Sequence, residues 1–389
     1  MFKIKTFNKI STKGLSRFPD ERYQVADNLD HADAYILRSH KLHDEPIPES
    51  VKAIARAGAG VNNVPVDVCS KKGVVVFNTP GANANAVKEL VLAGMLLSSR
   101  GITAGMEYAQ SLHQMSDAAQ MHKQLETEKK RFAGRELAGK TLGVVGLGAI
   151  GSLVADMALS LGMKVIGFDP ALSVEAAWRL PSQVTKMENL SSLLANADYV
   201  SLHVPAIEPT HHLINTVALA TAKKGLVLLN FARESIVDPQ ALVASLNADH
   251  LGQYICDFPE PCLLGNHKVI AMPHIGASTA EAEENCAVMA ADQLMNYLEN
   301  GNIKNSVNFP AVAMTRDGKC RITFANENVS GVLGEVLSVF TRHQLNVVDM
   351  VNKSRGDVAY NILDVENKVS EAIAEEIRIL QHVIFVRIL

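Results

Sequence analysis

Three side chains in the second half of the chain could together carry out carboxylate binding and proton transfer. Arg233, Glu260 and His274 each follow a short apolar run typical of a strand, in the segments NFAR, DFPEP and MPHIGAS. A guanidinium can hold a substrate carboxylate and polarise a C–O bond, and histidine as a residue type is suited to take a hydroxyl proton near neutral pH. A carboxylate beside that base would orient and tune it. The set predicts hydride transfer from a 2-hydroxy acid, although singly each residue also fits a turn, a helix cap or an ordinary loop histidine.

A glycine-rich turn predicts a binding site for the dinucleotide that would accept the hydride. The β-type run Thr141–Val145 leads directly into Gly146, Gly148 and Gly151, in the spacing G-x-G-x-x-G. Such glycines allow a tight turn, close approach of the backbone to a pyrophosphate, and close packing of a helix on a strand. The N-terminus of the following helix offers unpaired N–H groups and a positive dipole to an anion. Together these features predict a dinucleotide site rather than an isolated glycine turn.

An acidic residue indicates which dinucleotide binds. Apolar residues recur with helical spacing over residues 150–161, and a second strand-type run, Lys164–Phe168, ends in Asp169. A carboxylate at this position accepts hydrogen bonds from the adenosine ribose hydroxyls and repels a 2′-phosphate. Pro170, rather than an arginine, follows it, so NAD is predicted in preference to NADP.

Composition excludes several other classes of protein. The 389 residues suffice for two or three domains, and 48% hydrophobic with 20% charged residues is typical of a soluble globular protein. A net charge of -4 argues against a nucleic-acid partner. The five cysteines lack metal-site and C-x-x-C spacing, which predicts reduced thiols and no metal site. The longest apolar run, residues 90–97, is too short to span a bilayer, so we expect a cytoplasmic protein with no membrane partner.

The elements that must position these residues alternate between strands and helices, which predicts parallel sheets in an α/β fold. Residues 1 to about 97 form one small α/β unit, whose polar loops follow its strands and would line one side of a cleft. A second, doubly wound sheet begins at residue 141. Long helical stretches are expected at 87–98, 102–130 and 279–300.

The last seventy residues have a pattern of their own. Strand, helix, strand, strand, helix and strand follow one another, which predicts a separate ferredoxin-like β-α-β-β-α-β domain. The expected strands are residues 320–324, 346–350, 358–365 and 383–389, and the expected helices lie around 332–340 and 370–380.

These motifs resemble the D-2-hydroxyacid dehydrogenases, and among them the members that oxidise 3-phosphoglycerate. The resemblance is carried by RAGAGVNN (56–63), NTP (78–80), ELAGKTLG (136–143) running into GLGAIG, NFAR (230–233) and PHIGAST (273–279). It implies two Rossmann-like domains and a C-terminal ACT regulatory domain. The implied boundaries are 1–97 with 284–310 for a discontinuous substrate-binding domain, 98–283 for the NAD-binding domain, and 318–389 for the ACT domain.

The resemblance also implies roles for single residues. Arg233 would bind the substrate carboxylate, His274 would take the C2 hydroxyl proton, and Glu260 would hydrogen-bond His274. Relatives usually separate the aspartate and the glutamate by five positions, whereas Asp257 and Glu260 are three apart, but Glu260 is the only carboxylate between Asp257 and His274. The implied NAD contacts are Gly146, Gly148, Ala149, Ile150, Gly151, Asp169, Val204, Phe231, Ala232, Asp257, Gly276 and Ala277.

For the substrate, the resemblance implies contacts at Arg38, Ser39 and Asn83, together with Ala59 and Gly60. Lys129 would reach the phosphate of 3-phosphoglycerate from a neighbouring subunit of a homodimer or homotetramer, although its basic cluster also fits a solvated helix end.

In the ACT domain, Asn326, Asn328 and Asn346 match positions that bind L-serine as an effector, and the alternative is a purely structural dimerisation module. Two other functions stay open. The protein could be a D-2-hydroxyacid dehydrogenase for lactate, glycerate or 2-hydroxyglutarate, or a non-catalytic NAD-sensing regulator.

Overall fold

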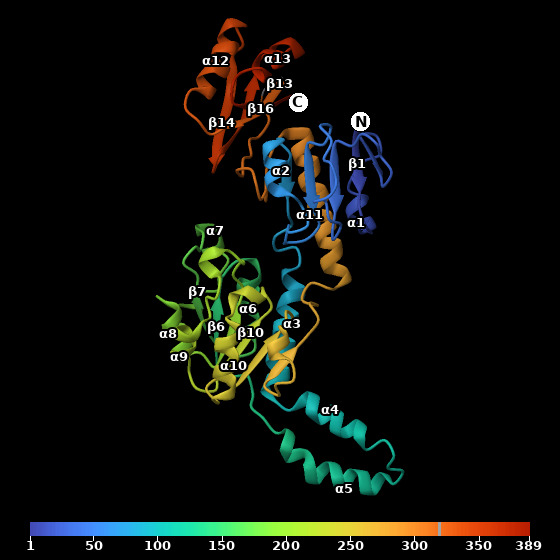
Figure 1. The fold of residues 1–389 in the computed structure, drawn as a ribbon, viewed down its shortest axis with the longest axis vertical. Coiled ribbons are helices and arrows are strands. Elements are labelled where there is room, and N and C mark those ends of the chain that lie inside the picture. Colours follow the sequence, from blue (N-terminus) through green and yellow to red (C-terminus); the bar gives the residue numbers. More distant parts are fainter. Residues whose placement is uncertain (318–319) are drawn as a thin grey trace. The chain divides into compact units, whose positions relative to one another are not determined.

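The computed structural model describes residues 1–317 and 320–389, and the chain forms two compact units (Figure 1). The first unit combines Met1–Asn83 with Ala280–Leu389, and the second is Ala84–Thr279. Parallel sheets with helices between their strands, and a separate antiparallel sheet at the C-terminus, confirm the predicted fold class. The functional boundaries near residues 97 and 283 stay predictions, and the expected start of the last domain at residue 318 lies outside the described residues.

The first unit contains a five-stranded parallel sheet in the order β2-β1-β3-β4-β5. Its core lies between the sheet and the apolar face of the long helix α11, because buried residues of both belong to one cluster. The strand order reverses between β1 and β3, which is where open α/β sheets bind ligands. The elements are β1 Phe2–Thr6, α1 Thr12–Leu15, β2 Tyr23–Ala26, β3 Ala34–Leu37, β4 Ala53–Arg56, α2 Val66–Lys71, β5 Val75–Phe77 and α11 Ala280–Asn300.

The C-terminal part of this unit is a four-stranded antiparallel sheet in the order β14-β15-β13-β16, with two helices. The element order and the central pair of strands are those of the predicted ferredoxin-like domain. Its elements are β13 Cys320–Glu327, α12 Val332–Arg342, β14 Val347–Arg355, β15 Val358–Val365, α13 Glu371–Arg378 and β16 Val383–Ile388.

This C-terminal sheet holds the carbonyl end of α11. Arg387 donates to the carbonyl oxygen of Leu298 at 2.8 Å, and Arg321 donates to that of Asn300 at 2.9 Å. Arg321 also forms two hydrogen bonds with Asp364, at 2.6 and 2.8 Å, and both side chains are fully buried. Two cations therefore satisfy carbonyls that a helix end leaves without partners, and they oppose its negative dipole.

The second unit is built on a seven-stranded parallel sheet in the order β12-β11-β10-β9-β6-β7-β8. The order reverses between β6 and β9, so the loops after these two strands meet at the switch point. The strands are β6 Thr141–Val145, β7 Lys164–Phe168, β8 Thr185–Lys186, β9 Tyr199–Leu202, β10 Val227–Asn230, β11 Gln253–Cys256 and β12 Val269–Ala271. The helices are α3 Ala84–Ser99, α4 Ile102–Ser111, α5 Ala118–Glu128, α6 Ala149–Ser160, α7 Val174–Ala177, α8 Leu190–Asn196, α9 Thr216–Ala220 and α10 Pro239–Asn247, with 3₁₀ turns η1 Lys129–Phe132, η2 Glu208–Thr210, η3 Glu234–Ile236 and η4 Pro261–Leu263.

The prediction of one helical stretch over 102–130 was wrong. Helix α4 ends at Ser111, and α5 starts at Ala118 because the Asp117 carboxylate caps it by accepting hydrogen bonds from the N–H groups of Ala119 and Gln120. The two helices form a hairpin that extends away from the sheet of its unit, and neither contains a buried residue (Figure 1).

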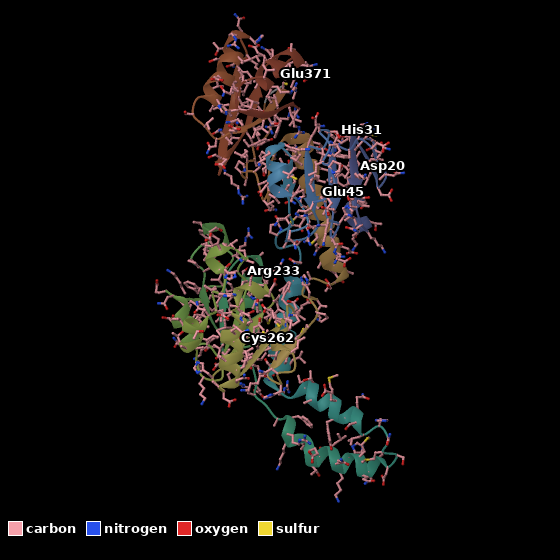
Figure 2. All side chains as sticks on the ribbon, in the orientation of Figure 1. Asp20, His31, Glu45, Arg233, Cys262 and Glu371 are labelled. Atoms are coloured by element: carbon pink, nitrogen blue, oxygen red, sulfur yellow. The ribbon has the colours of Figure 1, made fainter. Side chains whose placement is uncertain are left out.

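All five cysteines are unpaired, and only Cys262, labelled in Figure 2, is exposed. No helix in the described part of the chain combines the length and apolar character needed to cross a membrane.

Candidate active site

The glycine turn lies at the switch point of the second sheet, directly after β6. Gly146 has a φ of +88°, and a Cβ atom there would lie 2.6 Å from the carbonyl oxygen of His203. A Cβ atom on Gly151 would lie 1.9 Å from the carbonyl oxygen of Gly146. Helix α6 starts at Ala149, and its N-cap, Gly148, provides no side-chain hydrogen bond. The first N–H groups of the helix therefore remain available to a pyrophosphate, as the sequence predicts.

Asp169 is brought to the same turn from the end of β7. Its Oδ2 accepts a hydrogen bond from the N–H of Leu147 at 2.8 Å, and its Oδ1 accepts one from the N–H of Ala171 at 2.9 Å. Each carboxylate oxygen has a further lone pair, so the fixed carboxylate can still accept hydrogen bonds from ribose hydroxyls.

Asp257, at the end of β11, is a buried carboxylate with one open oxygen. Its Oδ2 accepts a hydrogen bond from the N–H of Gly276 at 2.8 Å, and its Oδ1 has no hydrogen-bond partner in the described structure. Burial raises the pKa of Asp257, while the Gly276 N–H and the charges of His274 and Arg233 oppose that rise. Because an unpaired buried acceptor is costly, Oδ1 fits an N–H donor such as a nicotinamide carboxamide.

Arg233 follows β10 in a loop that a buried asparagine fixes. The side-chain amide of Asn230 donates to the carbonyl oxygen of Arg233 at 2.9 Å and to the hydroxyl of Tyr254 at 3.2 Å. The Asn230 carbonyl group accepts a hydrogen bond from the N–H of Ala232 at 3.1 Å. These contacts orient the backbone of Arg233, which lies at one end of the sheet (Figure 2).

His274 and Arg233 both contact the side chain of Phe258. The backbone N–H of His274 donates to the carbonyl oxygen of Asp257 at 2.8 Å, and the residue has a φ of +46°. Its imidazole packs on the Phe258 ring with 4.2 Å between centroids, and the Arg233 guanidinium lies 5.1 Å from the centre of the same ring. A cation and an imidazole from two strand ends thus meet beside Asp257.

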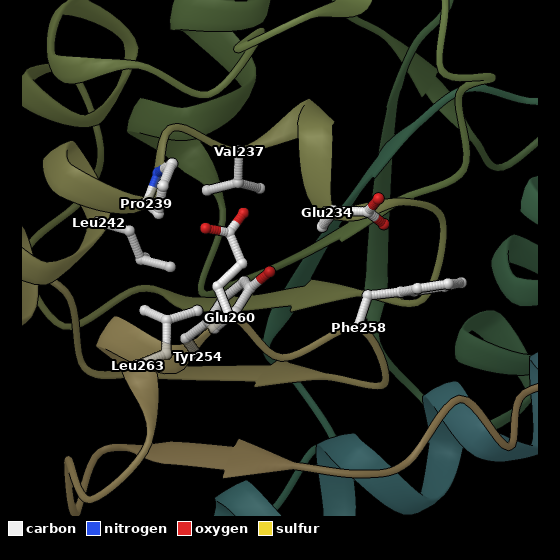
Figure 3. Close-up of a pocket in the computed structure, with 8 residues that line it drawn as sticks. All are labelled: Glu234, Val237, Pro239, Leu242, Tyr254, Phe258, Glu260 and Leu263. Atoms are coloured by element: carbon white, nitrogen blue, oxygen red, sulfur yellow. The ribbon is translucent and has the colours of Figure 1, made fainter.

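Glu260 takes a different direction. Its side chain points toward Val237 and Pro239 in a small pocket that Tyr254 and Phe258 also line, and Phe258 extends in a different direction from Glu260 (Figure 3). No hydrogen bond or ion pair joins Glu260 to His274 in the part of the chain that the structure describes. The Glu260–His274 hydrogen bond stays a prediction.

The remaining cofactor positions, Val204, Phe231, Ala232 and Ala277, follow β9, β10 and β12 at the same edge of the sheet. Sequence reasoning missed two residues here, Phe258 and His203. His203 lies 2.8 Å from the Ser201 hydroxyl, and burial lowers the pKa of His203 to about 3, so it stays neutral at physiological pH. The sequence feature that could have indicated His203 is its position directly after the apolar strand β9.

In the first unit, Arg38 and Ser39 follow β3 at the switch point of the five-stranded sheet. The Asn8 side chain accepts hydrogen bonds from the N–H groups of Ser39 at 3.2 Å and His40 at 2.6 Å, which fixes this loop. The Arg38 guanidinium forms an ion pair with Glu283 of α11 at 2.6 Å. The predicted cation therefore already has an anionic partner on the first turn of that helix.

The other substrate positions differ in how they are held. The Asn78 side chain donates to the carbonyl oxygen of Ala59 at 2.6 Å, which fixes the loop containing Gly60. The Oδ1 atom of Asn83 is buried without a hydrogen-bond partner among the described residues. Lys129, by contrast, pairs with Glu126 on the exposed hairpin.

The side-chain amides of the three predicted effector residues form hydrogen bonds within the C-terminal sheet and its loops. Asn326 accepts a hydrogen bond from Asn361 at 2.9 Å, and Asn328 donates to the carbonyl oxygen of Gly356 at 3.1 Å. Asn346 donates to Glu366 at 3.3 Å. The prediction that they bind an effector stays open. Across residues 1–317 and 320–389, no group of three or more histidine, cysteine or acidic side chains is arranged to hold a metal ion.

Comparisons with known proteins identify the family of this chain. Residues 102–276 match the family described as D-isomer specific 2-hydroxyacid dehydrogenase, NAD binding domain. The chain is 32% identical to the D-3-phosphoglycerate dehydrogenase of Escherichia coli K12, over 91% of this chain and 85% of that protein. It is also 32% identical to that of Methanocaldococcus jannaschii, of whose length it spans 61%. The NAD-bound 3-phosphoglycerate dehydrogenase of Entamoeba histolytica is structurally similar, with a TM-score of 0.59 and 26% identity over 79% of this chain and 98% of that one.

Proposed function

Because this chain belongs to the D-isomer specific 2-hydroxyacid dehydrogenases, we propose that it oxidises D-3-phosphoglycerate to 3-phosphohydroxypyruvate with NAD, the first step of serine biosynthesis. The observation that carries the proposal is the meeting of Arg233 and His274 at the Phe258 ring, beside the open oxygen of Asp257. The names of the phosphoglycerate dehydrogenases that resemble this chain support the choice of substrate.

The residues of the second unit divide the chemistry between them. The glycine turn and Asp169 would hold the pyrophosphate and the adenosine ribose, and Asp257 would accept a hydrogen bond from the carboxamide. Bound NAD would supply the acceptor for the hydrogen that leaves C2 with its electron pair. Arg233 would hold the substrate carboxylate and polarise the C2–O bond, while the imidazole of His274 takes the hydroxyl proton.

For the phosphate we propose Arg38 and Ser39, with Asn83, Ala59 and Gly60 around the rest of the substrate. A phosphate carries more negative charge than a carboxylate, so it can replace Glu283 as the partner of Arg38. That exchange is easy because both side chains of the pair are about 40% exposed, and exposed ion pairs contribute little free energy. Lys129 of a neighbouring subunit would add a second cation. We also propose the domain boundaries predicted from the sequence, 1–97 with 284–310, 98–283 and 318–389.

The substrate assignment predicts that 3-phosphoglycerate supports NADH formation at a kcat/KM about ten- to a hundredfold above that of glycerate, lactate or 2-hydroxyglutarate, because a lost charged contact commonly costs about that factor. The measurement is NADH absorbance with each acid at matched pH. Equal or better rates with an unphosphorylated acid would contradict the substrate. NAD binding without turnover of any 2-hydroxy acid would favour the NAD-sensing regulator.

We further propose that the C-terminal sheet is an ACT domain that responds to L-serine. The βαββαβ order supports this. Asn326 and Asn328 lie beside the start of β15 and Asn346 beside its end, and the amides of all three have partners within the domain. A serine titration of the phosphoglycerate-dependent rate should give a saturable change, which glycine at equal concentration does not. A flat titration would leave the domain a structural dimerisation module.

The proposal also includes a homodimer or homotetramer in the cytoplasm. Neither α4 nor α5 contains a buried residue, which supports a role of this hairpin in subunit contact. The unpaired cysteines support a reducing compartment.

A further inference from the structure

Phe258 is in contact with both residues to which the chemistry is assigned. Its ring centroid lies 4.2 Å from that of His274, at an interplanar angle of 42°, and 5.1 Å from the Arg233 guanidinium carbon. These two residues come from different loops, one after β10 and one after β12, and no hydrogen bond or ion pair between their side chains occurs in the described structure. The Phe258 ring is therefore a side chain that contacts both residues.

We propose that Phe258 is a positioning residue that sets the spacing between Arg233 and His274 and stabilises the imidazolium formed during the reaction. This inference rests on the proposed function. The substrate carboxylate and the C2 hydroxyl are on adjacent carbons, so the group that binds one and the base for the other must stay at a fixed separation. A rigid ring with two rotatable bonds meets that requirement at low entropic cost.

The ring also addresses an electrostatic problem. When His274 takes a proton, a second cation forms close to Arg233, and the two repel each other. The negative face of an aromatic ring attracts both cations. Asp257, from β11, provides the buried charge that interacts with the same pair, since the charges of His274 and Arg233 both act on its carboxyl group.

The short segment between Asp257 and Glu260 explains why the aromatic residue lies here. Asp257 is anchored by Gly276, and Glu260 starts the turn η4 with its side chain directed toward Val237 and Pro239. With two residues between these anchors, Phe258 extends in a different direction from Glu260 (Figure 3), and its ring contacts Arg233 and His274. In this conformation Phe258 contacts His274. Glu260 is the other residue to which the sequence assigns the orientation of His274.

The test compares Phe258→Leu, Phe258→Tyr and Glu260→Gln in the full-length protein. We expect Phe258→Leu to lower kcat for phosphoglycerate about ten- to a hundredfold, the scale of a small misplacement of reacting groups. Phe258→Tyr, which keeps the ring, should stay within about threefold of the parent. Oxidation needs neutral His274, and loss of the ring destabilises the imidazolium. The acid limb of kcat/KM should therefore move to lower pH by about half a unit, the size of an exposed cation–aromatic contact.

A second measurement does not depend on turnover. Carbethoxylation of His274 by diethylpyrocarbonate, followed by peptide mass spectrometry as a function of pH, reports the unprotonated imidazole directly. In Phe258→Leu the midpoint should move in the same direction as the rate profile, and by more than it moves in Glu260→Gln, the variant that removes the carboxylate predicted to hydrogen-bond His274. An unmoved midpoint in Phe258→Leu, or a larger movement in Glu260→Gln, would overturn the proposal. If the parent protein does not oxidise phosphoglycerate, the proposed function fails, but this reactivity test still decides the role of Phe258.

Discussion

His274→Asn should reduce kcat for phosphoglycerate oxidation by about 10²- to 10⁴-fold, the range that a positioned general base contributes. The imidazole is the group at this site suited to take the hydroxyl proton at neutral pH, and an amide cannot do so. Asparagine is the better replacement than alanine because His274 has a φ of +46°, a left-handed conformation that asparagine tolerates. Steady-state NADH formation measures kcat, and quenching of protein fluorescence measures whether NAD still binds with unchanged affinity.

His212→Asn is the matched control for this variant. His212 also has a left-handed backbone, with a φ of +48°, and its ring stacks on His211 rather than on a residue of the site. It should keep the parent kcat within about twofold, as substitutions away from special features usually do. A kcat for His274→Asn within tenfold of the parent would remove His274 from the role of base.

Arg233→Lys should lower kcat/KM by about 10²- to 10³-fold, although the charge is kept. A guanidinium binds a carboxylate through two parallel N–H donors and can polarise the neighbouring C–O bond, whereas an ammonium presents a single point. Loss of one such donor to developing charge commonly costs this factor. We expect KM to rise and kcat to fall together, because Arg233 contacts the substrate both before and during the reaction.

Arg17→Lys provides the control for a change of arginine to lysine. Arg17 pairs with Asp292 at 2.8 Å on the surface of the first unit, where an ion pair contributes little free energy. Its kcat/KM should equal that of the parent. Millimolar guanidinium should restore part of the activity of Arg233→Ala but not that of Arg233→Lys. That result would show that the missing groups are the N–H donors of the guanidinium. Should Arg233→Lys retain more than a third of the parent kcat/KM, two-point binding by this residue would be ruled out.

The parallel sheets could be predicted because local signals and tertiary structure agree. The glycine turn, the apolar face of α6 and the terminal Asp169 specify one strand–helix–strand unit, and the structure confirms it. The interruption between α4 and α5 was missed because both flanking segments have helical composition, and Asp117 is recognised as a cap only once α5 is known to start there. Propensity alone does not separate one long helix from two.

The site was predictable only as far as strand ends bring residues together. The positions of Arg233 and His274 follow from that rule, since parallel strands end at one edge of the sheet. Side-chain direction does not follow from it. Glu260 turns into a small pocket beside Val237 and Pro239, and the Phe258 ring packs on the imidazole of His274. The short segment after Asp257 fixes the backbone of both residues, and residue types alone do not reveal that.

The discontinuous first unit has a consequence for folding during synthesis. Strands β3, β4 and β5 are made early, but their hydrophobic cluster is completed by α11 and by residues of the C-terminal sheet. Roughly 200 residues of the second unit are made in between, which takes about 10 to 40 seconds at ribosomal rates. Over that interval, the face of the sheet that α11 later covers stays exposed, while the other face packs against residues of the same early segment. The nascent chain should therefore need chaperone protection that the continuous second unit does not.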